Sequence, residues 1–168
     1  MSAVDLSTHP GHLARRFQQA HHLLWTTMVS EETTSPQFAL LNTLMAEPGL
    51  DQRTAGERIG LDRSTIADLV TRLLGRGLLD KVRDPQDGRR SVLRLTESGT
   101  RVHRKVALRA TRMNQVFLGP LSADEQGVFL DLLRRVSDAA ETLRTPTDPP
   151  PAPLPAPAYG TASGTASG

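Results

Sequence analysis

Apolar residues recur at three- and four-residue spacing along most of the chain, which predicts a mainly helical protein. A first amphipathic helix is predicted over about residues 11–29, with an apolar stripe of Leu13, Phe17, Ala20, Leu24 and Met28. Ser35 and Pro36 are typical of an N-cap and a first helical position, so a second helix is predicted to begin there. Pro48 and Gly49 end that helix.

The middle of the chain predicts two short helices and a hairpin. Asp51 can cap the first short helix, which ends at Gly60, and Asp62 can cap the second. The second helix has an apolar stripe of Ile66, Leu69, Val70 and Leu73 and ends at residues 75–77. Segments 78–83 and 91–95 are typical of short strands, joined by a polar, turn-rich loop. Together these elements predict a winged helix-turn-helix over about residues 36–95.

Two further helices are predicted over about residues 97–144. Thr96 can cap the first, and Ser122 with Glu125 forms a capping box for the second. The last helix has an apolar stripe of Val128, Phe129, Leu132, Leu133, Val136 and Leu143. These helices and the first one are longer than a small winged domain needs, so we expect their stripes to meet a second copy of the chain. The predicted fold is mainly α: a winged helix-turn-helix with a two-stranded β-wing and N- and C-terminal dimerisation helices.

Residues 145–168 differ in composition from the rest. Seven of the thirteen residues 145–157 are proline, and the motif TASG then occurs twice. Such a segment has too little apolar surface to offset the entropy cost of ordering, which predicts a disordered tail after a domain of residues 1–144. A proline-rich signalling ligand is the alternative.

The net charge of +2 conceals an uneven distribution. Residues 53–112 hold 15 Lys and Arg against 7 Asp and Glu, a balance of +8, so the remainder has a balance of −6. This indicates a basic working surface, with a solvated helix face as the alternative. The chain has no cysteine, no apolar run near the ~18 residues of a membrane span, and no secretion signal in its first residues. A cytoplasmic protein is therefore expected.

The second short helix is the candidate DNA reader. Its polar face presents Arg63, Ser64, Thr65, Asp68 and Arg72, which can bond base edges or phosphates in a major groove. Free amides at the helix N-terminus are also expected to favour phosphate. Asp68 can accept from a cytosine amino group, or pair with Arg72 one turn later.

The hairpin loop adds a second basic element. Arg89 and Arg90 lie beside Gly88 at the predicted tip, where arginine suits a narrow minor groove. A merely solubilising role for these charges is the alternative.

His21 and Trp25 are one helical turn apart on the first helix, at the edge of its apolar stripe. A polar ring beside an aromatic wall suits a small aromatic ligand, whereas ordinary packing at a dimer seam is the alternative. His9 and His12 are three residues apart, but no carboxylate or cysteine clusters with them, so no metal site is expected.

Several of these segments resemble the MarR family of winged-helix transcription regulators. The matching segments are residues 35–41, 61–66, 77–79 and 84–99, of which the last resembles the family's wing signature DPxDxRxxxLxLT. The resemblance implies an obligate homodimer, an imperfectly palindromic operator, and a pocket between the dimer helices and the winged domain. More narrowly, residues 9–25 and 112–117 are similar to actinobacterial repressors of protocatechuate catabolism. That similarity suggests Arg15 as a carboxylate anchor reaching the partner's pocket, and Met113, Asn114 and His9 as further ligand residues.

We therefore expect a sequence-specific, homodimeric repressor that binds double-stranded DNA and is released by a small aromatic carboxylate of the hydroxybenzoate type. A constitutive or architectural DNA-binding protein without a ligand is the main alternative. An enzyme is not expected, because the chain has no glycine-rich phosphate loop, nucleophile elbow or paired carboxylates. No cofactor is expected.

Overall fold

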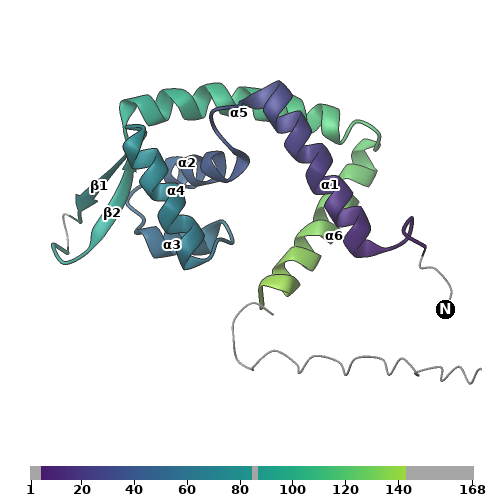
Figure 1. Cartoon of the computed structure of the whole chain (residues 1–168), viewed down its shortest axis with the longest axis horizontal. Coiled ribbons are helices and arrows are strands. Elements are labelled where there is room, and N and C mark those ends of the chain that lie inside the picture. Colours follow the sequence, from purple (N-terminus) through teal and green to yellow (C-terminus); the bar gives the residue numbers. More distant parts are fainter. Residues whose placement is uncertain (1–4, 85–86, 143–168) are drawn as a thin grey trace, which may run out of the picture. The chain divides into compact units, whose positions relative to one another are not determined.

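The computed structural model describes residues 5–84 and 87–142, so the predicted tail lies outside the described residues. Its elements are α1 (Pro10–Leu24), the π-helical turn η1 (Trp25–Val29), α2 (Ser35–Ala46), α3 (Gln52–Arg58), α4 (Arg63–Gly75), β1 (Leu79–Arg83), β2 (Ser91–Leu95), α5 (Glu97–Phe117) and α6 (Ala123–Thr142) (Figure 1). The predicted mainly helical fold with a two-stranded wing is confirmed. No helix within the described ranges is long and apolar enough to cross a membrane.

Among the described residues, those up to Leu130 form one compact unit and those from Asp131 to Thr142 belong to a second. The first unit holds every element of the winged domain, together with α1, η1 and α5. In the second unit, the C-terminal part of α6 carries an exposed apolar stripe that includes Leu132 and Val136.

Most helix starts follow from local capping chemistry. Asp51 and Asp62 accept hydrogen bonds from backbone amides two or three residues on, and Thr96 does the same for the amide of Gly99, as predicted. The start of α2 was predicted one residue late, because its N-cap is Thr34 rather than Ser35. A capping box explains the difference: Gln37, three residues after Thr34, donates its amide to the Thr34 hydroxyl and accepts from the Thr34 amide.

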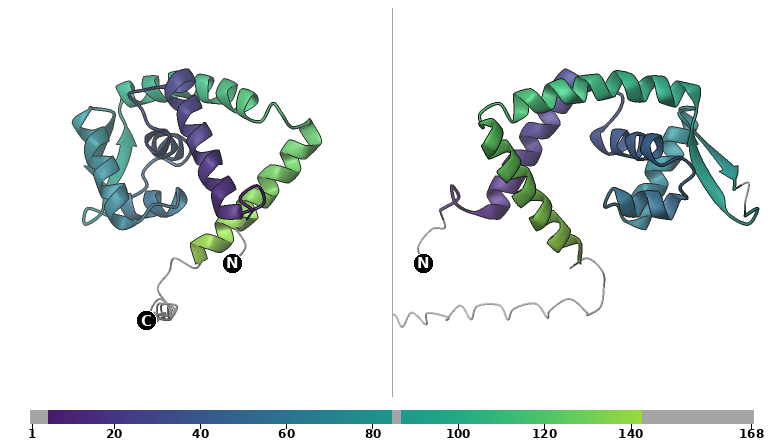
Figure 2. Two further views of the ribbon diagram at one scale, coloured as in Figure 1. Left: turned by 45° about the vertical axis from the view of Figure 1, so that its right-hand side comes forward. Right: turned by 180° about the vertical axis from the view of Figure 1, so that it is seen from behind.

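Two hydrophobic cores form within the first unit. The winged-helix core brings together α2, α3, α4 and the wing, with Leu40, Leu41, Leu73 and Leu93 fully buried. A second, smaller core joins η1 to α5 through Trp25, Val29, Val106, Ala110 and Met113. Figure 2 shows the end of the N-terminal helical segment lying beside α5. Val102 on α5 packs against both cores, so α5 connects η1 to the winged domain.

The inward face of the first helix differs from the predicted stripe near its end. Leu13, Ala20 and Met28 are exposed in the single chain, whereas Trp25 and Val29 are buried. The amide of Ser30 bonds to the carbonyl of Trp25, five residues back, which is the spacing of a π-helix. This wider turn changes the angular spacing of residues 25–29, so a stripe extrapolated from α-helical geometry is wrong there.

The helix-turn-helix and the wing are held by short-range turns and one strand pair. Gly60 adopts a φ of 67° between α3 and α4, a left-handed conformation that glycine adopts without steric cost. β1 and β2 pair antiparallel in the register Leu79↔Leu95 to Arg83↔Ser91. The amide of Leu93 also donates to the carbonyl of Leu50 over 2.8 Å, which ties the wing to the segment before α3.

Candidate functional site

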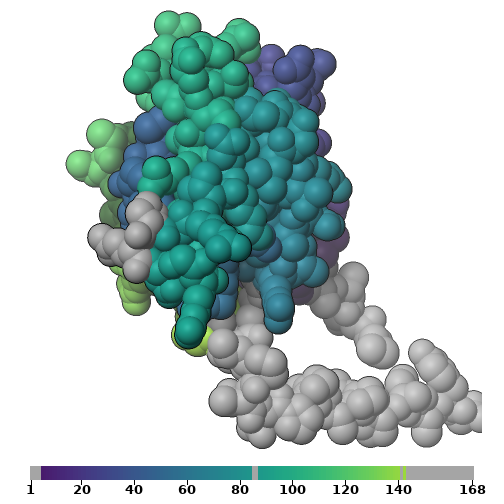
Figure 3. Space-filling model, turned by 90° about the vertical axis from the view of Figure 1, so that its left-hand side faces the viewer, coloured from purple at the N-terminus to yellow at the C-terminus, as the bar shows by residue number. Residues whose placement is uncertain are grey.

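The recognition helix α4 separates an apolar face from a polar one, as predicted. Its buried residues are Ile66, Leu69, Val70 and Leu73. Its exposed residues include Arg63, Ser64, Thr65, Asp68 and Arg72. Figure 3 views the molecule from the side on which the wing lies, with α3 and α4 next to the wing. Both candidate DNA-contacting elements therefore belong to one continuous surface.

The N-terminus of α4 is capped more completely than the sequence suggested. One oxygen of Asp62 accepts from the amides of Ser64 and Thr65, at 3.0 and 2.9 Å. The hydroxyls of both residues also donate to this carboxylate. These bonds, the Ser64 hydroxyl first, lower the pKa of Asp62, which stays ionised. The expectation that these amides are free for phosphate is wrong, because the Asp62 carboxylate already accepts from them. The same carboxylate also orients the side chains of Ser64 and Thr65, two candidate DNA-reading residues.

Asp68 has room for a partner outside its own helix. No hydrogen bond or ion pair joins it to Arg72 in the part of the chain that the structure describes, so the intrahelical pairing is not seen. Both residues instead line a groove of about 280 Å³ that also includes Ser64, Thr65 and Gln37. The alternative of contact with a base therefore remains a prediction.

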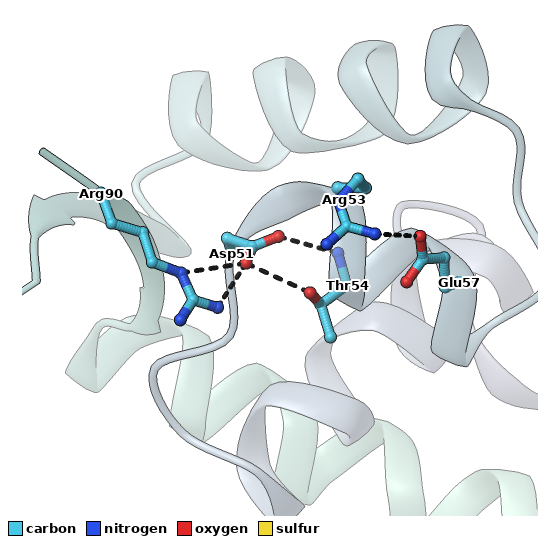
Figure 4. Close-up of polar contacts among 5 residues, drawn as sticks. All are labelled: Asp51, Arg53, Thr54, Glu57 and Arg90. Carbon is cyan, nitrogen blue, oxygen red and sulfur yellow. Dashed lines mark hydrogen bonds and ion pairs between the residues drawn. The ribbon is translucent and has the colours of Figure 1, made fainter.

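The two neighbouring arginines of the wing have different surroundings. The guanidinium of Arg90 reaches Asp51, the N-cap of α3, through its Nε and Nη2 atoms (Figure 4). The Asp51 carboxylate also accepts from the amide of Thr54, and this bond, with help from Arg90, lowers its pKa to about 2. The Arg89 guanidinium is exposed and has no hydrogen bond or ion pair to any described residue. Arg90 thus ties the wing to the helix-turn-helix, whereas the Arg89 guanidinium faces solvent.

A groove of about 610 Å³ lies between α3, the start of α4 and the wing. Arg63 lines it together with two cations that the sequence reasoning missed, Arg53 and Lys81. Arg53 forms a 2.5 Å ion pair with Glu57 on its own helix. Basic residues at the start of a helix-turn-helix and on the first wing strand are a signal that could have identified both.

The two wing arginines give a matched pair of substitutions. We expect Arg89→Ala to weaken operator binding by about 1–3 kcal/mol, the usual loss for one groove-inserted or bidentate arginine, without changing the melting temperature. Arg90→Ala, unlike Arg89→Ala, should lower the melting temperature, by a few degrees at most. A partly exposed ion pair contributes about 0–1 kcal/mol to the free energy of unfolding. Fluorescence anisotropy and thermal denaturation measure the two effects. Unchanged operator affinity in Arg89→Ala at physiological salt would contradict the assignment.

Rings from five elements form a continuous aromatic cluster in the first unit. Its members are Phe17, His21, Trp25, Phe38, His103, Phe117 and Phe129, with centroid separations between neighbours of 4.7–5.9 Å. His21 is half-buried and lies between Phe117 and Trp25, at 5.8 and 5.9 Å. Burial, and to a smaller extent the neighbouring His22, lowers the pKa of His21, so its ring is neutral at neutral pH.

Trp25 is more enclosed than the predicted aromatic wall. It is only 5% exposed, and its indole Nε1 donates to the carbonyl of Thr33 over 2.7 Å. Its polar edge is therefore already used inside the chain. His21 is left as the accessible polar group of the predicted pair.

The other predicted ligand residues are dispersed in the single chain. Met113 is fully buried in the core with Trp25, whereas Asn114 is exposed. His9 is the N-cap of α1 and accepts from the amide of His12. Arg15 is exposed and contacts Gln19 and His12, at 3.3 Å each. No carboxylate pairs with Arg15 within the described ranges.

His103 is a buried histidine that the sequence reasoning did not single out. Its ring stacks on Phe38 at an interplanar angle of 12°, and its Nε2 atom lies 3.0 Å from Oδ1 of Asn42 on α2. Its Nδ1 atom is buried and has no hydrogen-bond partner among the described residues. Burial first, and the charge of Arg104 second, lower the pKa of this ring.

His103 makes stability depend on pH. The unfolded chain binds a proton near pH 6.5, whereas the folded chain binds it only at lower pH. The contribution of neutral His103 to the free energy of unfolding is therefore complete above about pH 6.5, and it is lost as the pH falls through the lowered pKa of the folded chain. We expect the melting temperature to fall between pH 7 and pH 5, and to fall less in His103→Gln. The exposed His22→Gln variant is the control, and identical pH profiles in all three proteins would contradict the role of His103.

Three features define a winged-helix DNA-binding protein: a second helix with an exposed polar face, a wing with an exposed arginine, and a groove between them. The groove is lined by Arg53, Arg63 and Lys81 and by the carboxylates of Asp51 and Glu57. A family model described as MarR family matches residues 33–90. The chain is also 30% identical, over 82% of its length and 87% of the relative, to the transcriptional repressor NicR of Pseudomonas putida. The chain belongs to the MarR family of transcription regulators, which are not enzymes.

Solved structures extend the comparison. The PcaV transcriptional regulator of Streptomyces coelicolor, in complex with its natural ligand, is 77% identical with a TM-score of 0.80, over 83% of this chain and 99% of that one. BpsR of Bordetella bronchiseptica, whose DNA binding is regulated by 6-hydroxynicotinic acid, is 27% identical with a TM-score of 0.76, over 82% and 99%. The winged-helix assignment therefore rests on the geometry and on the family together.

Proposed function

We propose that this protein is a homodimeric repressor that binds an imperfectly palindromic operator and leaves it when a hydroxybenzoate such as protocatechuate binds. The observation that carries the ligand part is His21, a half-buried, neutral imidazole between two aromatic rings. An imidazole in such a setting can bond a phenolic hydroxyl while the rings contact the ligand's own ring. The resemblance to ligand-bound PcaV and to BpsR supports the same class of ligand.

DNA recognition follows from the surface around α4. Thr65 and Arg63 would contact base edges in the major groove, with Ser64, Asp68 and Arg72 along the same face. Arg89 would enter the adjacent minor groove, and Arg53 and Lys81 would contact phosphates from the groove between α3 and the wing. Arg90 would act indirectly by holding the wing in place.

The dimer is proposed from apolar surface that the single chain leaves uncovered. Leu23 is 63% and Leu108 is 70% exposed, and Leu13, Val116 and Val128 are also exposed, all on the helices outside the winged domain. Large apolar side chains that a single chain leaves exposed on long helices are typical of a protein–protein interface. A twofold dimer would also place the two α4 helices in successive major grooves.

The partner chain would complete the ligand pocket. Arg15 lies on the side of α1 opposite Phe17, so it cannot face the aromatic cluster of its own chain. From the partner it would pair with the ligand's carboxylate, and His9, Met113 and Asn114 would close the pocket. Ligand releases DNA if it binds more tightly to the arrangement of the two winged domains that does not fit the operator.

Operator release by a panel of aromatic acids tests the proposal. We expect hydroxybenzoates to displace the protein from DNA upstream of its own gene, and the methyl ester of the active acid, which lacks the charge, to be inactive. Sedimentation of the free protein should give twice the chain mass of 18.3 kDa. DNA affinity that ignores every acid would favour a constitutive DNA-binding protein, and a monomer would exclude the shared pocket.

A further inference from the structure

Arg76 ends the recognition helix and holds a segment far away in the sequence. It is the C-cap of α4, and its guanidinium extends to the loop of residues 30–34 between η1 and α2. Nη1 donates to the carbonyl of Glu32 over 2.9 Å and to Oε1 of Gln37 over 3.2 Å. Nη2 donates to the hydroxyl of Thr33 over 3.3 Å. All three acceptors are uncharged, so this arginine is bound by hydrogen-bond geometry and has no carboxylate partner there.

Thr33 is also the residue that receives the indole of Trp25. It is 2% exposed, its carbonyl accepts from Trp25 Nε1, and its amide donates to the Ser30 hydroxyl over 2.9 Å. One buried residue therefore bonds the aromatic cluster through its carbonyl and the recognition helix through its hydroxyl. A displacement of Trp25 cannot leave Thr33 in place without breaking a 2.7 Å hydrogen bond in a buried setting, which is costly.

The loop has room to move as a unit. It borders a depression of about 300 Å³ that is lined by Val29, Thr33, Arg76, Lys105 and Arg109, among others. Arg109 on α5 holds the start of the loop through the carbonyl of Val29 over 3.1 Å, and Arg76 holds its end. A shift of the loop into or out of this space would move Thr33 and, through the Thr33 carbonyl, act on Trp25.

We infer that Arg76 is a coupling residue, which passes the position of Trp25 through Thr33 to the C-terminal end of the recognition helix. This deepens the proposed function, on which it rests for the nature of the ligand. Ligand bound beside Trp25 would shift Thr33, and Arg76 would carry that shift to α4. By thermodynamic linkage the coupling is reciprocal, so operator binding to α4 must also alter the environment of Trp25.

The chain has a built-in reporter for this reciprocity, because Trp25 is its only tryptophan. We expect operator DNA to change the indole emission of the wild-type protein, and this change to be lost in Arg76→Ala and in Thr33→Val. Thr33→Val removes only the hydroxyl that Arg76 contacts and keeps the carbonyl that Trp25 contacts. Arg101→Ala is the matched control, since Arg101 is an exposed arginine that bonds only Glu97 and Ser98 on its own helix.

The same variants are then titrated with protocatechuate. The ratio of operator Kd with and without saturating acid should fall from about 5–150-fold in the wild type to about one in both variants, with the affinity for the acid unchanged. The coupling would be overturned if Thr33→Val kept both the operator-induced emission change and the ratio of operator Kd values that the wild type shows. So would a loss of operator affinity confined to Arg76→Ala, which would make Arg76 a phosphate contact. If the wild type ignores protocatechuate, the proposed ligand class fails, while the operator-induced emission change still decides whether Arg76 couples the two sites.

Discussion

Replacing Arg15 by alanine should give a repressor that binds its operator normally and no longer leaves it when a hydroxybenzoate is added. A carboxylate that enters an apolar cleft loses its hydration, and arginine is the side chain best shaped to compensate through two parallel hydrogen bonds. Arg15 is exposed, and among the described residues its side chain bonds only Gln19 and His12, so its removal should cost the free protein little stability. It lies on α1, outside the DNA-contacting surface, so operator affinity should stay unchanged.

Calorimetric titration and operator gel shifts measure the two halves of this prediction. Removing one partner of a buried, hydrogen-bonded charge pair costs about 2–5 kcal/mol, so the affinity for the acid should fall by at least roughly 30-fold. Arg16→Ala is the matched control, one position along the same helix. An Arg15→Ala protein that binds the acid as tightly as wild type would show that Arg16 or a histidine is the anchor.

Replacing Gly99 by alanine should destabilise the junction between α5 and the winged domain strongly. A Cβ at this position would lie 2.0 Å from the carbonyl oxygen of Leu78 and 3.0 Å from its carbon. That carbonyl cannot easily move, because it also accepts from the amide of Thr96, and the Thr96 hydroxyl bonds Gly77. The start of α5 would have to separate from the base of the wing, at a cost of about 3 kcal/mol, the upper end of typical overpacking.

Thermal denaturation of Gly99→Ala beside Gly75→Ala tests this steric argument. Gly75 is the last residue of α4, and a Cβ there meets nothing within 4 Å. Alanine at that position should be neutral or stabilising by up to about 1 kcal/mol, because it restricts the unfolded chain. A Gly99→Ala melting temperature within a degree or two of Gly75→Ala would disprove the close approach.

The elements of this protein could be predicted from the sequence because their causes are local. Asp51, Asp62 and Thr96 cap helices through atoms two or three residues away, and the periodicity of α4 separates its buried face from its polar face. Two details of the helices were predicted wrongly, because they depend on a side-chain cap and on a wider helical turn that periodicity does not reveal. The cap of α2 lies at Thr34 because of Gln37, and the π-helical turn displaces the stripe that was predicted to include Met28.

Only the tertiary structure assigned different roles to similar residues. Arg89 and Arg90 are neighbours with the same side chain, and what distinguishes them is Asp51, which is 39 residues away in the sequence from Arg90 and beside it in space. Gly99 on α5 is likewise close to the carbonyl of Leu78, just before β1. Capping and periodicity depend on a few consecutive residues, whereas these contacts depend on how separate elements pack, and no short window of sequence contains both partners.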